Sequence, residues 1–252
     1  MLLPVFVIHW NAPDWCQETV TAFRSSVGVD VSITVIDNGS TRLPSLSNDV
    51  VIDRRYANIG YSGAANHAIE LATAQSVPFF AVASHDVTVS PDCLEAMIRV
   101  ASTDPSVGIV GPNFGQDTVV DGWVSGSLML LRTACVRDVG MFDTIFGSYC
   151  EEVDYCHRAS ARGWQLAIAK EAIATTHGSR HPAQARLLMD ANFTLLAAKE
   201  GDWRRVFRRI GGMAKRCITD PGGGWQWSLL LSMRQLARLI FRGIFVVRRR
   251  AS

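Results

Sequence analysis

The stretch from residue 31 to residue 40 reads V-S-I-T-V-I-D-N-G-S and sets the pattern of the N-terminal half. Its first six residues are mostly β-branched, which is typical of a buried strand, and the last four are strong turn formers. Apolar runs that end in polar residues recur at residues 4–11 and 78–86. Helix-like stretches alternate with these runs, at residues 14–26, 62–75 and 91–103. This alternation predicts an α/β fold with a mostly parallel central sheet flanked by helices.

The second half continues the pattern with longer turns. Residues 107–135 resemble β structure with turns, and residues 150–162 and 182–199 resemble helices on either side of a strand at 165–169. Residues 220–224 (D-P-G-G-G) break any regular element. We therefore expect two parts. One is a domain over residues 1–200, which is long enough for a catalytic domain, and the other is a helical C-terminal appendage over residues 201–252.

Composition and charge support this division. The chain has 252 residues, of which 48% are hydrophobic and 19% charged, and this excludes a disordered chain and a collagen. Residues 1–180 hold 11 Lys and Arg against 19 Asp and Glu, a net charge of −8. Residues 181–252 hold 14 against 4, a net charge of +10. A chain divided in this way is expected to present two surfaces with different tasks.

Several classes of segment and site find no support in the sequence. No uncharged apolar run reaches the roughly 18–20 residues that span a bilayer. The opening residues lack a basic n-region, so we read them as a first strand and expect a cytoplasmic protein. The six scattered cysteines form no C-x-x-C pair and are expected to be reduced thiols. The dinucleotide fingerprint, the P-loop and the hydrolase elbow are all missing from the sequence.

Polar side chains stand where three of the predicted strands end. In parallel α/β sheets, ligands bind beyond the carboxyl ends of the strands, so three polar tips on one edge predict a pocket. Each tip alone is also what an ordinary turn contains. The three tips are Trp10-Asn11, Asp37-Asn38 and His85-Asp86.

Three acids lie close together at the start of the predicted helix at 150–162. Glu151 and Asp154 share one helix face, while Glu152 points about 100° away. Clustered acids raise one another's pKa, which suits a general base. The alternative is a solvated acidic helix start that the helix dipole favours.

A strand-end carboxylate and a distant histidine are candidate metal ligands. Asp86 is placed as the oxygen ligand of a Mg²⁺ or Mn²⁺ ion that bridges two phosphates, and His177 is a candidate second ligand. The alternative for His177 is a structural imidazole. Residues 58–66 (N-I-G-Y-S-G-A-A-N) form a glycine-rich turn that would let a helix start approach a ligand closely.

Taken together, these segments resemble the family 2 glycosyltransferases, and within them the rhamnosyltransferase-like and galactofuranosyltransferase-like members. The resemblance runs from about residue 4 to about residue 195, and it rests on the order and spacing of motifs that are individually weak. The motifs are V-I-H-W-N (7–11), V-I-D-N-G-S-T (35–41), N-I-G-Y-S-G-A-A-N (58–66), H-D-V-T-V-S-P-D (85–92), V-G-I-V-G-P (107–112), W-V-S-G-S (123–127), G-M-F-D (140–143), E-E-V-D-Y-C-H-R (151–158) and T-H-G-S-R (176–180).

The resemblance implies a GT-A type domain and inverting transfer of a sugar from a nucleotide-diphosphate donor, of the dTDP-rhamnose or UDP-sugar type, to an acceptor hydroxyl. It implies Glu152 as catalytic base, with Glu151 and Asp154 beside it in the acidic motif. It implies Asp86 and His177 as ligands of Mg²⁺ or Mn²⁺. The positions that it implies for binding the nucleotide sugar are Trp10, Asn11, Asp37, Asn58, Gly60, Asn66, His85, Asp86 and Trp123.

The sequence departs from the family pattern at two points. The element that is D-x-D in the family reads Ser84-His85-Asp86 here, so that metal binding rests on one strand-end carboxylate and His177. Glu152 stands where Asp is more common, which adds one methylene of reach. Because the D-x-D element keeps only one of its acids, an alternative stays open. The protein could be a non-catalytic protein that binds sugar nucleotides, or a scaffold, at a membrane surface.

The basic tail predicts contact with an anionic membrane. Residues 225–247 are rich in large apolar side chains, and Arg234, Arg238 and Arg242 recur every fourth residue along one helical stripe. Such a helix is expected to lie on the membrane, which implies a peripheral protein at the inner face of the cell membrane and a glycan or lipid-linked acceptor. The alternatives are packing on the catalytic domain or on a second subunit of a homo-oligomer. Signatures of nucleic-acid binding are missing from the sequence.

Overall fold

The structure of the chain is a computed structural model that describes residues 2–115 and 122–250, with side chains described up to residue 243. Contacts between residues divide the chain into two compact units. The first, the sheet unit, comprises Met1–Asp143 and Glu151–Gly178, and the second, the helical unit, comprises Thr144–Cys150 and Ser179–Ser252. By their contacts, residues 179–199 belong to the helical unit. The domain boundary expected at residue 200 stays a prediction.

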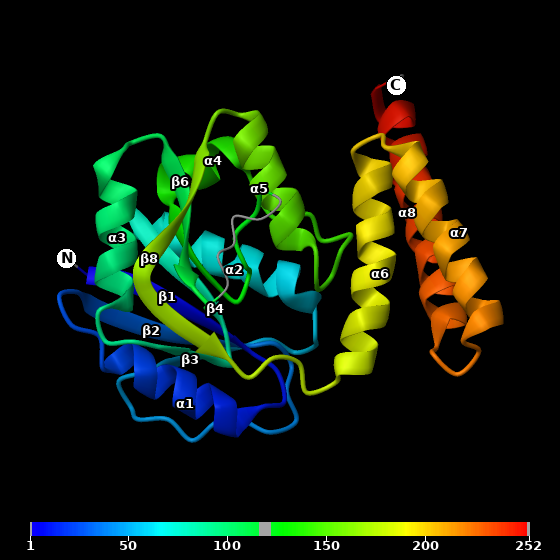
Figure 1. Cartoon of the computed structure of the whole chain (residues 1–252). Helices are drawn as coiled ribbons and strands as arrows, with labels where there is room; N and C mark the ends of the chain where they lie inside the picture. The colour runs from blue at the N-terminus through cyan, green and yellow to red at the C-terminus, as the bar shows by residue number, and fades with distance from the viewer. Residues whose placement is uncertain (1, 116–121, 251–252) are drawn as a thin grey trace. The chain divides into compact units, whose positions relative to one another are not determined.

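The sheet unit is built on one eight-stranded sheet with the order β3-β2-β1-β4-β7-β6-β8-β5 (Figure 1). Strands β3, β2, β1 and β4 are parallel neighbours, as the sequence predicts, and β6 is parallel to β8. Strand β7 is antiparallel to both β4 and β6, and β5 is antiparallel to β8, so the sheet is mixed. The strands are β1 (Leu2–His9), β2 (Asp30–Asp37), β3 (Val51–Arg54), β4 (Phe79–Ser84), β5 (Val87–Val89), β6 (Val107–Asn113), β7 (Leu128–Arg132) and β8 (Gln165–Thr176).

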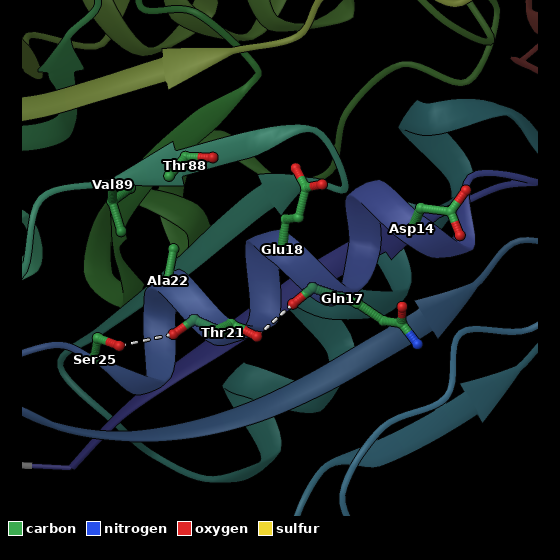
Figure 2. A pocket seen from close by; sticks show the side chains of 8 residues that line it. All are labelled: Asp14, Gln17, Glu18, Thr21, Ala22, Ser25, Thr88 and Val89. Atoms are coloured by element: carbon green, nitrogen blue, oxygen red, sulfur yellow. Dashed lines mark hydrogen bonds between the residues drawn. The ribbon is translucent and has the colours of Figure 1, made fainter.

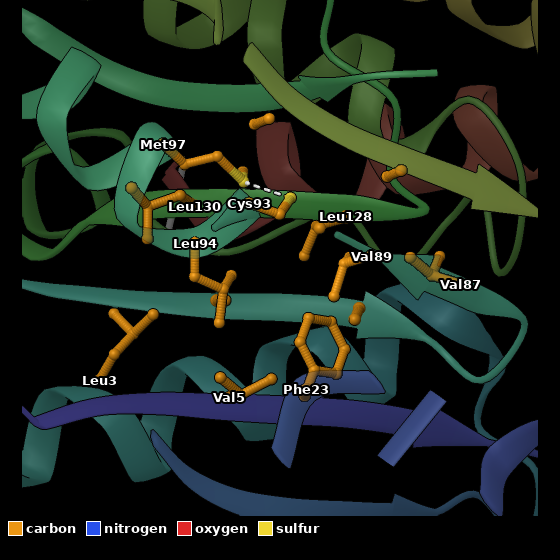
Figure 3. Close-up of a cluster of buried hydrophobic side chains, with 14 of the residues drawn as sticks. Leu3, Val5, Phe23, Val87, Val89, Cys93, Leu94, Met97, Leu128 and Leu130 are labelled. Carbon is orange, nitrogen blue, oxygen red and sulfur yellow. Dashed lines mark hydrogen bonds between the residues drawn. The ribbon is translucent and has the colours of Figure 1, made fainter. Parts of the chain in front are cut away.

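Helices cover both faces of this sheet because its central strands are apolar on both sides. In β1, Leu3, Val5 and Val7 belong to one buried cluster, whereas Phe6 and Ile8 belong to the other, as the period of two of a strand requires. Figure 3 shows the first cluster, in which β1 packs on the two helices of that face. The first face is covered by α1 (Pro13–Arg24) and α3 (Cys93–Thr103), and the second by α2 (Gly60–Ala74), α4 (Thr133–Val139) and α5 (Glu151–Ala161).

The helical unit consists of three helices that contact one another in pairs. They are α6 (Pro182–Lys199), α7 (Trp203–Thr219) and α8 (Trp225–Arg250). The break at residues 220–224 separates α7 from α8 as the sequence predicts. Among the described residues, none of these helices combines the length and the apolar character that crossing a bilayer requires.

The structure adds two elements to those expected from the sequence, strand β5 and helix α4, which are too short to give a periodic signal. Helix α7 lies within the C-terminal appendage, which the sequence predicts to be helical. Strand β8 continues to Thr176, well past the predicted end at residue 169. All six cysteines are free thiols in the structure, five of them buried and Cys217 partly exposed, and their reduced state stays a prediction.

Candidate active site

The carboxyl ends of β1, β2 and β4 meet at one edge of the sheet. Their parallel register pairs Ile8 with Ser84 and His9 with Asp37, so the polar tips that follow these strands are neighbours. The tips at residues 10–11, 37–38 and 85–86 therefore lie side by side, as expected from the sequence. This placement is the starting point of the site.

A buried histidine–carboxylate pair joins β1 to β2 at this edge. His9 Nδ1 lies 3.0 Å from Asp37 Oδ1, and both side chains are fully buried. Burial lowers the pKa of His9, although Asp37 acts in the opposite direction. His9 Nε2 accepts the Ala12 N–H at 3.2 Å, so the neutral ring donates from Nδ1 to Asp37. The sequence analysis did not identify His9 as a candidate. It could have been found as a histidine at the end of an apolar strand.

Asp37 is held by further donors, so its carboxylate is fixed in place. Its Oδ2 accepts the Ser40 N–H at 3.3 Å and lies 3.5 Å from Arg54 Nε. The expected role of Asp37, facing the base of the nucleotide, stays a prediction. What the structure adds is that the carboxylate itself is buried beneath the loop that follows β2.

The expected binding residues Asn11 and Asn58 hold the loops around this edge. Asn11 Oδ1 accepts the N–H and the hydroxyl of Thr41, at 2.8 and 3.0 Å. Asn58 Oδ1 accepts the Gly60 N–H at 2.8 Å and an Asn38 Nδ2–H at 3.1 Å. The two side chains thus shape the loops, while Trp10 beside Asn11 is 42% exposed and is available to a ligand.

Gly60 and Asn66 act on the backbone around α2. Gly60, the first residue of the helix, has φ +78°, a conformation that glycine adopts without strain. Asn66 Nδ2 donates to the Phe142 carbonyl at 3.0 Å, and Asn66 Oδ1 accepts the Phe142 N–H at 2.8 Å. The Asn66 amide therefore fastens α2 to the G-M-F-D turn.

Asp86 is a nearly buried carboxylate between β4 and β5, and it is 9% exposed. The Ser84 hydroxyl donates to Oδ1, while the Thr176 hydroxyl and the Gly178 N–H donate to Oδ2 at 2.5 and 3.1 Å. The antiparallel pairing of β5 with β8 creates this arrangement, and it also places the His177 N–H 3.0 Å from the Asp86 carbonyl oxygen. The structure thus brings Asp86 and His177 together along the backbone.

The imidazoles of His85 and His177 both stack on Trp15 of α1. The ring centroids are 6.3 Å apart for His85 and 5.0 Å apart for His177, with near-parallel planes. His85 Nδ1 donates to the Ile8 carbonyl at 3.1 Å, and His177 Nε2 lies 2.8 Å from Glu18 Oε2. Trp15 and Glu18 are contacts that the sequence analysis did not identify, because nothing in the local pattern links α1 to a histidine so far along the chain.

These donors fit a divalent ion only in part. A Mg²⁺ ion needs one or two protein carboxylates when substrate phosphates supply its other ligands, and Asp86 is placed to be one. No group of three His, Cys, Asp or Glu side chains able to hold a metal occurs within residues 2–115 and 122–243. The Nε2 atom of His177 is engaged by Glu18, so His177 as a metal ligand stays a prediction.

The three acids of α5 have different surroundings. Glu151 is only 4% exposed, and burial, followed by the charge of Glu152, holds its pKa well above the ordinary value. Asp154 is also buried and accepts Arg158 Nε at 2.8 Å. Arg158 in turn donates to the carbonyls of Val139 and Met141. Glu152 is half-buried, which makes it the least buried of the three acids, although its Oε2 atom is inaccessible to solvent.

Tyr61 links the acids of α5 to Asp86. Its hydroxyl donates to the Gly126 carbonyl at 2.5 Å. Burial raises its pKa well above the ordinary value, and the nearby charges of Glu151, Glu152 and Asp86 raise it further. The Tyr61 hydroxyl thus holds the turn at Gly126, against which Glu152 packs. The sequence analysis quoted Tyr61 only as part of the N-I-G-Y-S-G motif.

The W-V-S-G-S segment forms a wall of this site. A Cβ atom added to Gly126 would lie 3.3 Å from Glu152 Cβ, so glycine leaves room for the acid to pack against the turn. The Ser127 carbonyl accepts the Ser84 N–H at 2.9 Å, which ties the turn to the end of β4. Trp123 packs against the second core cluster and stays partly exposed, in keeping with its expected role as a pocket wall.

A separate surface pocket of about 570 Å³ lies between α1 and β5 (Figure 2). Its polar lining comes from Asp14, Gln17, Glu18, Thr21, Ser25 and Thr88. None of the residues expected to bind the nucleotide sugar lines it. Its link to the site is Glu18, which also contacts His177.

Comparison with known proteins agrees with this geometry. The family model described as "Glycosyl transferase family 2" matches residues 5–164, which include β1 to α5 and the acids Asp86 and Glu152. The N-acetylglucosaminyl-diphospho-decaprenol L-rhamnosyltransferase of Mycobacterium tuberculosis is 24% identical over 241 residues, covering 71% of this chain and 77% of the relative. Rhamnosyltransferase WbbL of Escherichia coli is 34% identical over 104 residues, covering 39% of each chain.

Solved structures of low sequence identity share the fold. The mannosyltransferase PcManGT from Pyrobaculum calidifontis, in complex with GDP-Man and Mn²⁺, gives a TM-score of 0.63 at 14% identity, covering 94% of this chain and 74% of that one. S. aureus TarS 1-349 in complex with UDP-GlcNAc gives 0.63 at 12%, covering 92% and 79%. The fold is therefore the GT-A type that the sequence predicts, and the chain belongs to glycosyl transferase family 2.

Proposed function

We propose that this protein is an inverting glycosyltransferase that moves a sugar from a nucleotide-diphosphate donor, of the dTDP-rhamnose or UDP-sugar type, to an acceptor hydroxyl in cell-wall polysaccharide assembly. The observation that carries the proposal is that one turn joins the start of α5 to the carboxyl end of β4. Glu152 packs against Gly126 of this turn, and Ser127 bonds to Ser84, whose hydroxyl contacts Asp86. The rhamnosyltransferase names of the relatives support the class of donor and acceptor.

In the proposed reaction Glu152 is the general base. The acceptor hydroxyl gives its proton to the Glu152 carboxylate while the oxygen attacks the anomeric carbon, and the bond to the nucleoside diphosphate breaks with inversion. Glu151 is buried and its pKa is raised, first by burial and then by the charge of Glu152, so its protonated form is favoured over that of an exposed carboxyl. Asp154 is paired with Arg158, and Glu152 is the least buried acid of the motif, which supports Glu152 as the base.

A bound Mg²⁺ or Mn²⁺ would supply positive charge for the departing diphosphate. Asp86 would hold it, because its carboxylate stands at the end of β4 with the other ligands left to phosphate oxygens. The hydrogen bonds from Ser84, Thr176 and Gly178 would orient that carboxylate. The Mn²⁺ complex of PcManGT supports a divalent ion for a neighbour of this fold.

The central test replaces the proposed base by its amide. Glu152→Gln keeps the size of the side chain and removes its ability to accept a proton, so we expect transfer to be lost while donor binding is nearly unchanged. The measurements are sugar transfer and donor affinity by calorimetry, with Glu171→Gln, an exposed acid on β8, as the control. Near-normal turnover in the Glu152 variant would move the base role to Glu151 or Asp154.

A second test separates an enzyme from a sugar-nucleotide-binding scaffold, which is the alternative that the short D-x-D element leaves open. We expect Asp86→Ala to lose donor hydrolysis and transfer in the presence of Mn²⁺ or Mg²⁺, because it removes the carboxylate at the diphosphate. Wild-type protein that binds donor without hydrolysing or transferring it under either ion would favour the scaffold.

The acceptor is proposed to be lipid-linked and reached at the inner face of the cell membrane. Helix α8 supports this, because it exposes Trp227, Leu230 and Phe241 together with Arg234 and Arg238. Apolar and basic side chains on one exposed helix suit an anionic lipid surface. The name of the mycobacterial relative includes a decaprenol acceptor, which supports the same class.

A further inference from the structure

A fully buried amide in the helical unit holds the loop that leads to the acidic motif. Asn192, in the middle of α6, directs Nδ2 at three backbone carbonyls, those of Phe146, Ser148 and Tyr149, at 2.9, 2.8 and 2.9 Å. Its Oδ1 accepts a hydrogen bond from Gln235 Nε2 of α8 at 3.0 Å. This bond fixes which end of the Asn192 amide faces the loop, because Oδ1 is turned toward a donor.

The held loop ends in a backbone conformation that side chains rarely adopt. Tyr149 and Cys150 have φ values of +70° and +69°, and neither is glycine. Consecutive left-handed residues persist only where their surroundings impose them. The hydrogen bond to the Tyr149 carbonyl acts on the peptide between these two residues. Glu151, the next residue along the chain, begins α5 and the acidic motif.

We propose that Asn192 is a positioning residue for Glu151 and Glu152, and that Gln235 orients its amide. The inference rests on the proposed function, since it concerns the same acids. All the hydrogen bonds of the Asn192 side chain lie within the helical unit. Asn192 acts on the acids through the backbone, because only Cys150 separates Tyr149, whose carbonyl it binds, from Glu151. The C-terminal helices would therefore set the geometry of the proposed base as well as any membrane contact.

The alternative is that Asn192 only stabilises the packing of α6. An isosteric variant distinguishes the two. Asn192→Asp retains the shape but turns a carboxylate oxygen toward three carbonyl oxygens, which repel it unless it is protonated. When the carboxyl takes up a proton, its O–H can again donate to one of these carbonyls. We therefore expect the turnover of this variant, relative to wild type at the same pH, to rise as the pH falls.

The experiment compares Asn192→Asp, Asn192→Ala and Gln235→Leu in the full chain, with Ser232→Ala as matched control. Ser232 is equally buried and bonds to the Ser228 carbonyl of its own helix, away from the loop. Misplacing a reacting group by about 1 Å costs on the order of 10²-fold. We expect kcat of the Asn192 variants to fall by about that factor while KM for the donor changes little. Hydrogen exchange at the amides of residues 147–152 should speed up.

Wild-type kcat in folded Asn192→Ala, with unchanged exchange at residues 147–152, would overturn the inference. So would an equal loss of kcat in Ser232→Ala, because that would make the effect one of general packing. If the wild-type protein transfers no sugar, the proposed function fails by itself. The exchange measurement still decides whether Asn192 holds the start of the acidic motif, so the two failures remain distinguishable.

Discussion

Glu151 shows how burial separates the roles of adjacent acids. Its side chain is nearly inaccessible, and its Oε2 has no hydrogen-bond partner among the residues that the structure describes. A carboxylate in that position would be desolvated and would face the charge of Glu152, so the protonated form is favoured. The raised pKa of Glu151 therefore lowers the charge repulsion on Glu152, the proposed base.

The pH dependence of stability follows from this raised pKa. The folded protein keeps the Glu151 proton above the ordinary carboxyl value of 4.5, where the unfolded chain has already lost it. The contribution of this group to stability is therefore complete below pH 4.5 and is lost as the pH rises toward its folded pKa, by at most about 1.4 kcal/mol per pH unit. We expect Glu151→Gln to remove this decline in urea unfolding measured across that range. An unchanged slope in the variant would contradict the raised pKa.

At the scale of elements, the site depends on strand pairing and hydrogen bonds that join short segments far apart in the sequence. The pairing of β5 with β8 brings Thr176 and Gly178 to Asp86 across about 90 positions of sequence. The first turn of α2 supplies Tyr61, whose hydroxyl reaches the carbonyl of Gly126 in the W-V-S-G-S segment. The turn against which Glu152 packs is thus held from α2 on one side and from β4 on the other.

The bond between Tyr61 and Gly126 can be tested by removing one oxygen. Tyr61→Phe leaves the Gly126 carbonyl without its donor, so we expect the free energy of unfolding to fall by about 1–3 kcal/mol. We also expect kcat to fall because the turn beside Glu152 loosens. Denaturant unfolding and transfer assays measure the two effects. Tyr56→Phe is the control, since Tyr56 is fully exposed, and an equal effect in both variants would contradict the role of the bond.

At the scale of the whole molecule, the two units carry different surfaces. Helix α8 packs Leu236 and Leu239 against a buried cluster, yet it also buries Ser228, Ser232 and Gln235 and exposes several large apolar side chains. Helix α7 also exposes apolar side chains, those of Trp203, Phe207 and Ile218. The net charge of +10 over residues 181–252 accompanies these exposed groups. The combination supports a lipid surface as the partner of this unit.

Flotation of the full chain with vesicles tests this partner. We expect binding to anionic vesicles, weak binding to neutral ones, and loss of binding in a triple variant with Trp227, Leu230 and Phe241 changed to Ser. The matched control changes Val27, Val51 and Tyr56 of the sheet unit, of which the two valines are about as exposed as the residues of α8 and Tyr56 is fully exposed. Truncation near Asp220 is a poorer test, because it would also remove Gln235 from Asn192. Equal flotation of the triple variant and wild type would exclude α8 as the contact.

Most of the expected site residues belong to short motifs at strand ends, so the sequence predicts that they lie at one edge of the sheet. What those motifs do not reveal is which side chains face a ligand and which hold the backbone. Asn66 and Asp154 illustrate this, since their polar atoms bond to Phe142 and Arg158. His9, Trp15 and Tyr61 escaped notice because their partners lie far away in the sequence.

The amino-acid sequence by itself determined the α/β class, the parallel strands β1 to β4 and the helices between them, because these depend on local periodicity and turn residues. It also determined the family, through motifs whose order and spacing can be recognised in the sequence alone. Only the tertiary structure decided where β5 and β7 pair as antiparallel strands and which groups bond to Asp86. It alone also shows that Asn192 bonds to the loop before Glu151. Those features arise from contacts between segments distant in sequence, and such contacts leave no periodic trace in either segment.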